Sequence, residues 1–191
     1  TMVGAGAALL LQVASPTVAA GVREHSDFKA DPWGRLWRTL DYVHMLVYGG
    51  PAAVGTGRAM REMHKRIKGV APDGTRYHSL EPEAYAWVHA TLAETIVASH
   101  EHFGRPLDAA QVRAFYREWR GLGRLLGIRE QDLPADPEGF RASVEEMCAT
   151  RLGPSDVVDA ALASLADPKA PDIRGLGRSP CAIADGRVVP R

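Results

Sequence analysis

The sequence predicts an all-α fold built as a single helical domain. Helix start and stop signals recur along the chain, apolar residues follow helical spacing, and no convincing pair of strands is present. A length of 191 residues suits one domain with a sizeable core. We expect residues 1–166 to form the helical domain. Residues 167–191 are rich in Pro, Gly and Arg, and we expect them to form an extended tail.

The first half of the chain contains four predicted helices. Ser15-Pro16 and Asp31-Pro32 each combine a capping residue with a proline at the first helical position. Gly49-Gly50-Pro51 ends one helix, and Gly69 ends another. The helices are expected at about Val3–Ala14, Pro16–His25, Pro32–Tyr48 and Ala52–Lys68.

The second half contains four more predicted helices. Pro72-Asp73-Gly74 is typical of a turn, because proline presets its φ angle and glycine tolerates a positive one. Asp108 is a capping residue for a later helix. Gly55-Thr56-Gly57, in the fourth helix, indicates a close helix crossing or a kink. The four later helices are expected at about Pro82–Phe103, Ala109–Leu126, Pro137–Leu152 and Pro154–Ala166.

Composition narrows the classes of function. Lys plus Arg and Asp plus Glu both number 23, so the strongly basic balance of many nucleic-acid-binding proteins is absent and we expect no nucleic-acid partner. Cys148 and Cys181 form no C-x-x-C pair, which favours a reducing, cytoplasmic location.

The apolar run Val3–Leu11 has two interpretations, a buried core helix or a signal peptide. It lacks a basic leader and is too short for a membrane span, so we expect a core helix. The opening Thr1-Met2 is compatible with a fragment of a longer protein.

The most informative helix carries Arg61 and His64. These residues are three apart and share a helix face. A histidine on an apolar face can ligate iron through one ring nitrogen while a second partner holds the other, and an arginine fork can pair with a haem propionate. The alternative is a core histidine with a satisfied hydrogen bond. Residue types alone favour that alternative.

Other polar side chains with helical spacing are weaker candidates. Arg35 and Thr39 share a face, and Arg38 lies between that face and the apolar stripe, where an arginine is usually solvated or paired with a carboxylate such as Asp41. His89 either lines a pocket or makes a packing contact. The chain has no phosphate-binding G-x-x-x-x-G-K-[ST] loop, no G-x-S-x-G elbow and no H-E-x-x-H zinc motif.

Beyond single residues, the chain carries an ordered series of short motifs. They are Leu10-Leu11-Gln12-Val13-Ala14-Ser15-Pro16, Gly21-Val22, His25-Ser26-Asp27-Phe28, Asp31-Pro32, Arg35-Leu36, Arg38-Thr39, Tyr48-Gly49, Arg61-x-x-His64, Gly69, Gly74, Tyr77 and Trp87-Val88-His89-Ala90-Thr91. This series resembles the catalytic domain shared by bacterial rubber oxygenases (latex-clearing protein) and fungal MpaB-type oxygenases. The resemblance covers about Leu9 to Leu133.

The resemblance implies a globin-like helical core and a b-type haem. Its R-x-x-H helix makes His64 the proximal iron ligand and Arg61 a candidate propionate contact, and we expect His89 of the last motif at the same cofactor site. The family's distal R-x-x-x-T element matches Arg35 and Thr39. The residue before that threonine is lysine in latex-clearing protein and Arg38 here. A guanidinium is a poor iron ligand because it stays protonated. We therefore expect a distal side that differs from that of latex-clearing protein.

The resemblance also implies an acidic base on the segment before the R-x-x-x-T helix. Glu24 is the nearest candidate and Asp27 the next. The leading hypothesis is a haem b-dependent oxygenase that acts with O2 on an apolar small molecule, unsaturated or isoprenoid, with Arg35, Arg38 and Thr39 as catalytic donors. One alternative is a non-catalytic haem-binding helical protein, a sensor, carrier or partner subunit. Another is an interaction domain without a cofactor.

Overall fold

The all-α class and the single domain are confirmed in the computed structural model, which describes residues 4–26, 30–167, 181–184 and 187–190. Eight α-helices and one short 3-10 helix, η1 (Glu130–Asp132), lie within these residues. The α-helices are α1 (Ala5–Val13), α2 (Pro16–His25), α3 (Pro32–Tyr48), α4 (Ala52–His64), α5 (Pro82–Phe103), α6 (Ala109–Leu125), α7 (Pro137–Thr150) and α8 (Asp156–Ala166).

Capping side chains explain where several helices begin. Asp31 accepts a hydrogen bond from the backbone N–H of Gly34 at 2.8 Å, and Asp108 forms a complete capping box with Gln111. Ser15 precedes Pro16 with an extended backbone, but its side chain makes no capping hydrogen bond. The start of α2 therefore depends on the proline and on packing rather than on the serine cap that the sequence indicated.

The fourth helix is shorter than predicted. α4 ends at His64, and Lys68, expected inside it, begins the strand β1 (Lys68–Val70), which pairs antiparallel with β2 (Arg76–His78). The turn predicted at residues 72–74 joins the strands, with Gly74 at φ 86°. A Cβ atom on Gly69 would lie 2.7 Å from the Tyr77 hydroxyl. Glycine at this position therefore lets β1 pair with β2 without displacing Tyr77. Tertiary packing overrides the helical propensity of the preceding residues.

The C-terminal tail also contains a strand pair, which the sequence analysis did not predict. β3 (Cys181–Ala184) and β4 (Arg187–Pro190) pair antiparallel, with Cys181 opposite Pro190 and Ala184 opposite Arg187. The missed signal is the Asp185-Gly186 dipeptide between two short apolar runs, a combination typical of a two-residue hairpin loop.

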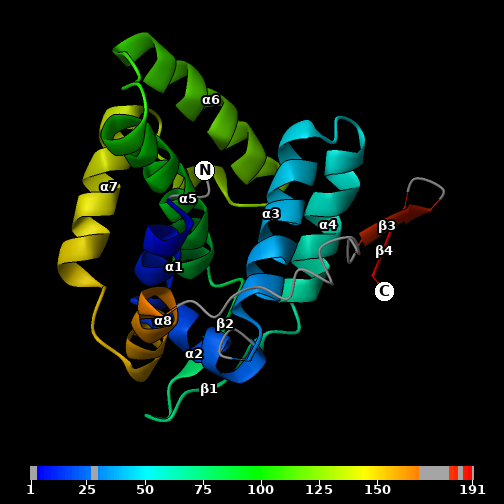
Figure 1. The fold of residues 1–191 in the computed structure, drawn as a ribbon, viewed down its shortest axis with the longest axis vertical. Helices are drawn as coiled ribbons and strands as arrows, with labels where there is room; N and C mark the ends of the chain where they lie inside the picture. The colour runs from blue at the N-terminus through cyan, green and yellow to red at the C-terminus, as the bar shows by residue number, and fades with distance from the viewer. Residues whose placement is uncertain (1–3, 27–29, 168–180, 185–186, 191) are drawn as a thin grey trace.

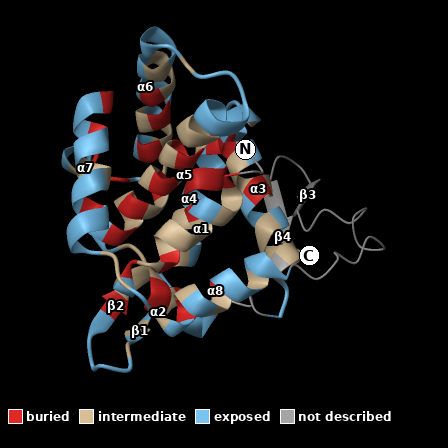
Figure 2. Cartoon of the chain, turned by 60° about the vertical axis from the view of Figure 1, so that its left-hand side comes forward, coloured by how far each residue is buried: buried red, intermediate tan, exposed pale blue. Residues whose placement is uncertain are grey.

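Helix α5 is the centre of the packing (Figure 1). A first core joins α1, α2 and α8, and a second joins α5, α6 and α7, while α3 packs beside α4. Figure 2 shows buried residues concentrated along α5 and the helices around it, whereas α8 is mostly exposed or intermediate. The first core consists of Val13, Ala19, Val22, Val157 and Ala161, and the second of Ala93, Tyr116, Trp119 and Phe140.

Two of the sequence motifs meet where α1 crosses α5. The indole N–H of Trp87 donates to the Leu11 carbonyl at 2.9 Å, and the Gln12 amide donates to the Thr91 hydroxyl at 3.0 Å. These bonds satisfy polar groups that the crossing would otherwise leave without partners.

No single helix in the described residues is long and apolar enough to span a membrane. Helices α1 and α2 are long and apolar enough only when they are taken together, and they are bent by 104° relative to each other.

Helix α4 approaches α6 closely at one glycine. A Cβ atom on Gly57 would lie 2.5 Å from Leu125 Cδ2 and 2.9 Å from the Leu125 carbonyl oxygen, whereas a Cβ on Gly55 would meet nothing within 4 Å. The close crossing predicted for Gly55-Thr56-Gly57 is therefore present, at its last residue. It holds the C-terminal half of α4 against the end of α6.

We expect Gly57→Ala to lower the free energy of unfolding by about 1–3 kcal/mol, because the new methyl group collides with backbone as well as side-chain atoms of Leu125. Gly55→Ala is the matched control in the same helix, and we expect it to raise stability by about 0.5–1 kcal/mol. Urea unfolding measures both changes. Equal effects of the two substitutions would show that α4 does not cross α6 as described.

Candidate functional site

His64 lies in the last turn of α4 with one ring nitrogen held in place. Its Nδ1 donates to the Met60 carbonyl oxygen at 2.8 Å, and its ring stands edge-on to the Tyr85 ring, with centroids 5.7 Å apart. Burial lowers the pKa of His64, which opposes protonation at neutral pH. Because Nδ1 carries the proton, the lone pair is on Nε2. A neutral imidazole with an anchored Nδ1–H is the form that ligates a metal.

Arg61 and Tyr85 join this histidine to the end of α6. The guanidinium of Arg61 donates to the Gly127 carbonyl at 3.2 Å, and the Tyr85 hydroxyl donates to the Leu126 carbonyl at 3.3 Å. Burial raises the pKa of Tyr85, against a smaller opposite effect of the Arg61 charge. α4, α5 and α6 therefore meet at one junction, and Arg61 and His64 both belong to it.

His89 lies one turn along α5 from Tyr85, on the same face. Its ring stacks on Trp119 with centroids 5.1 Å apart, and the Trp119 indole N–H donates to the His89 carbonyl at 3.1 Å. The side chain is buried, its Nε2 has no hydrogen-bond partner among the described residues, and burial lowers its pKa to about 4. A Cβ atom on Gly123 would lie 2.9 Å from that Nε2, so α6 also needs a glycine here.

A cleft of about 470 Å³ opens beside His89 between α5, η1 and α7. Its lining is mainly apolar and aromatic, as in most sites for small organic ligands. Arg129 and Asp132 at the cleft form an ion pair at 2.6 Å. The apolar and aromatic residues of the lining include Trp87, Tyr116, Leu133, Phe140 and Met147.

The candidate residues of α3 make their side-chain contacts within α3 and with the segment that joins it to α2. The guanidinium of Arg35 donates to the Ser26 hydroxyl at the end of α2, and Thr39 donates to the Arg35 carbonyl at 3.0 Å. Burial lowers the pKa of Arg35, and the Arg38 charge lowers it further. Arg38 is exposed and lies 3.5 Å from the Asp31 carboxylate, rather than pairing with Asp41. Within the described residues, no carboxylate pairs with Arg35.

Of the two acidic candidates, Glu24 is described and Asp27 lies outside the described residues. Glu24 accepts a hydrogen bond from the Tyr77 hydroxyl and lies 3.9 Å from His25 Nε2. Burial, followed by that hydrogen bond, raises the pKa of Tyr77 to about 12. The described carboxylate thus holds the end of α2 on the β1–β2 hairpin.

In the described part of the chain, no group of three or more His, Cys, Asp or Glu side chains is arranged to hold a bare metal ion. A haem iron differs because the porphyrin supplies most of its ligands and the protein needs to add only an axial side chain. The donor set around His64, a single oriented imidazole, therefore fits a haem better than a free ion.

Comparison with known families agrees with the sequence resemblance. The family described as the catalytic domain of the ER-bound oxygenase mpaB/B' and of rubber oxygenase matches residues 1–185. The chain belongs to this family. No curated protein and no solved structure matches the chain significantly. Membership of a family of oxygenase catalytic domains supports a general oxygenase function for the chain.

Sequence reasoning missed two aromatic residues that contact the candidate histidines. Tyr85 contacts the His64 ring, and Trp119 stacks on His89. A signal for Tyr85 existed, because it lies four residues before His89 and must share its face. Trp119 had no such signal, since its contact depends on how α6 packs on α5.

The burial of His89 makes stability depend on pH. Well above pH 6.5, the ordinary pKa of an unfolded histidine, neither the folded nor the unfolded chain protonates His89, so it does not affect stability. As the pH falls from 6.5 towards 4, the unfolded chain binds a proton that folded His89 excludes, and the free energy of unfolding falls. We expect His89 to account for a loss of about 2 kcal/mol between pH 7 and pH 5.

Urea unfolding of the original chain and of His89→Phe at both pH values isolates this effect. Phenylalanine keeps the stacking on Trp119 and does not titrate, so the variant should lose less stability on acidification. Identical pH dependence in both proteins would contradict the buried, neutral state of His89.

Proposed function

We propose that this chain is a haem b-dependent oxygenase that acts with O2 on an apolar small molecule, with His64 as the axial iron ligand. The observation that carries the proposal is the hydrogen bond from His64 Nδ1 to the Met60 carbonyl, which leaves Nε2 available. Membership of the oxygenase family supplies the reaction class.

His64 and Arg61 have separate roles in this proposal. His64 binds the iron as a neutral ligand, and the Met60 carbonyl keeps its ring orientation and its proton in place. Arg61 uses one nitrogen on the Gly127 carbonyl and has further N–H groups for a propionate carboxylate. A bound haem would supply the binding and activation of oxygen, with the protein contributing position and electrostatics.

Arg35 is the polar residue of α3 that best suits a role near bound oxygen or substrate. It is a half-buried cation whose hydrogen-bond partner, Ser26, is uncharged. Arginine stays protonated even when burial lowers its pKa, so it can donate hydrogen bonds to a negatively charged group without supplying a proton. Arg38 and Thr39 stay predicted donors, and they are exposed in the present structure.

The lining of the cleft beside His89 supports the proposed substrate class. Aromatic and aliphatic side chains make up most of that lining and favour an apolar ligand. The charged residues that also line the cleft are Glu81, Glu83, Arg129 and Asp132. The expected unsaturated or isoprenoid character and the cytoplasmic location remain parts of this proposal that come from the sequence.

Haem titration of the purified chain tests the cofactor. We expect a Soret band with the original chain and its loss in His64→Ala, because removing the imidazole removes the axial ligand. His102→Ala is the matched control, since His102 is exposed on α5 and should leave the band unchanged. Retention of the Soret band in His64→Ala would sink the assignment. A Soret band without oxygen consumption on any apolar alkene would favour the non-catalytic haem protein.

A pair of arginine variants tests the role of α3. We expect Arg35→Gln to keep the Soret band and to lower oxygen consumption by about tenfold or more, because a half-buried charged donor is lost. Arg117→Gln changes an exposed arginine on α6 to which no role is assigned, and it should have a much smaller effect. The measurement is oxygen uptake with haem-loaded protein and an apolar alkene. Equal losses in both variants would rule out a specific role for Arg35.

A further inference from the structure

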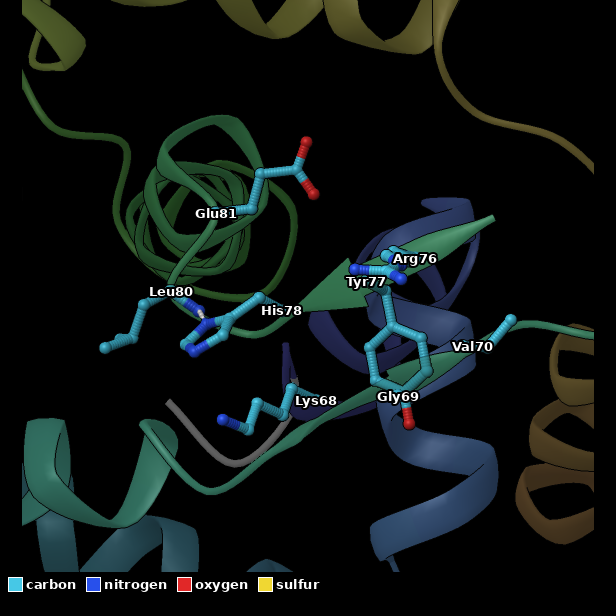
Figure 3. Close-up of a pocket in the computed structure, with 8 residues that line it drawn as sticks. All are labelled: Lys68, Gly69, Val70, Arg76, Tyr77, His78, Leu80 and Glu81. Carbon is cyan, nitrogen blue, oxygen red and sulfur yellow. Dashed lines mark hydrogen bonds between the residues drawn. The ribbon is translucent and has the colours of Figure 1, made fainter. Parts of the chain in front are cut away.

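An open cleft of about 710 Å³ lies along the β1–β2 hairpin (Figure 3) and borders the cleft beside His89 at Glu81, which lines both. Its polar lining is rich in hydrogen-bond donors from Lys68, Arg76 and His78. Val70, which is 56% exposed, and Leu80 add apolar surface. Neither the haem proposal nor the family description uses this cleft.

The strand register places the donors on one face of the hairpin. Lys68 is opposite His78, and Val70 is opposite Arg76. Side chains alternate along a strand, so these four residues share a face while Gly69 and Tyr77 occupy the other positions. Figure 3 shows the Lys68 and His78 side chains extending to the same side of the hairpin.

His78 is oriented as a donor by its own backbone. The Leu80 backbone N–H donates to His78 Nδ1 at 3.0 Å, so Nδ1 acts as an acceptor. A neutral imidazole carries its single proton on the other nitrogen, and Nε2–H is therefore the group available to a ligand. The cleft thus has a donor from His78 in addition to its two cationic side chains.

The cationic side chains of the cleft make no ion pair with the acid beside them. In the described residues, neither Lys68 nor Arg76 takes part in an ion pair. Glu81 is the acidic residue of the lining, and it accepts a hydrogen bond from the Thr17 hydroxyl at 3.3 Å. Glu24, behind the hairpin, accepts from Tyr77. With Lys68 and Arg76 against Glu81, the lining keeps one net positive charge and an excess of hydrogen-bond donors.

We infer that the β1–β2 cleft binds a phosphate-type anion. A guanidinium fork, an ammonium group and an imidazole N–H together offer donors to several oxygen atoms at once, which matches a tetrahedral oxyanion better than a single neutral acceptor. The same chemistry serves a free phosphate compound or the phosphate headgroup of a lipid, and the exposed Val70 beside the charges is compatible with either.

The full chain can be tested with two probes at low ionic strength. One is inorganic phosphate, followed by backbone amide NMR shifts. The other is phosphatidylcholine vesicles with and without phosphatidic acid, followed by co-sedimentation. We expect shifts at Lys68, Gly69, Arg76 and His78, or sedimentation that requires phosphatidic acid. We expect Arg76→Gln to weaken binding by about tenfold or more.

Arg113→Gln is the matched control, because Arg113 is an exposed arginine without an ion pair in the described residues. It belongs to α6, which lies far from the β1–β2 hairpin in Figure 1. Binding of inorganic phosphate that only Arg76→Gln weakens supports a site for free phosphate compounds. Binding confined to phosphatidic acid vesicles, with the same variant pattern, supports a lipid headgroup. No binding of either probe, or equal weakening by both variants, overturns the inference.

Discussion

The docking of α5 among its neighbours is the constraint on which the rest of the structure depends. Trp87 and Thr91 in its first half form hydrogen bonds with α1. Tyr85 donates a hydrogen bond to the backbone at the end of α6. Because these contacts fix both the position and the rotation of α5, they also decide which faces meet α4. Tyr85 is thereby brought against the His64 ring. The candidate site is a consequence of helix packing and not of a single loop.

The close approach of the α4 backbone to α6 positions the C-terminal half of α4 at the candidate site. Gly57 lets α4 approach Leu125 of α6, and Arg61 and His64 follow one and two turns later on the same helix. The helix ends at His64, so the ring is presented at a terminus beside the Ser79 hydroxyl, which donates to the His64 carbonyl at 2.6 Å. A histidine at this place is oriented by its own helix through Met60 and screened from water by Tyr85.

Local sequence signals predicted most of the helices. They failed where contacts with residues distant in the sequence determine the structure. Prolines and capping residues marked the starts of α3 and α6 correctly. The end of α4 was misplaced because β1 exists only through its pairing with β2 and the contact of Gly69 with Tyr77. For the candidate site, the spacing of Arg61 and His64 could be predicted. The partners of Arg35 and Arg38 could not, since Ser26 and Asp31 meet them only through the way the α2–α3 segment folds back.

The central claim is that folded His64 is a neutral imidazole with its proton on Nδ1. Nitrogen-15 NMR of the purified chain, labelled at histidine and assigned through His64→Gln, measures this directly at neutral pH. The account predicts that His64 shows the Nδ1–H tautomer, with Nε2 unprotonated, and that it titrates below the usual histidine pKa. A proton on Nε2, or an imidazolium at pH 7, would contradict the account, because the nitrogen assigned to the iron would then have no free lone pair.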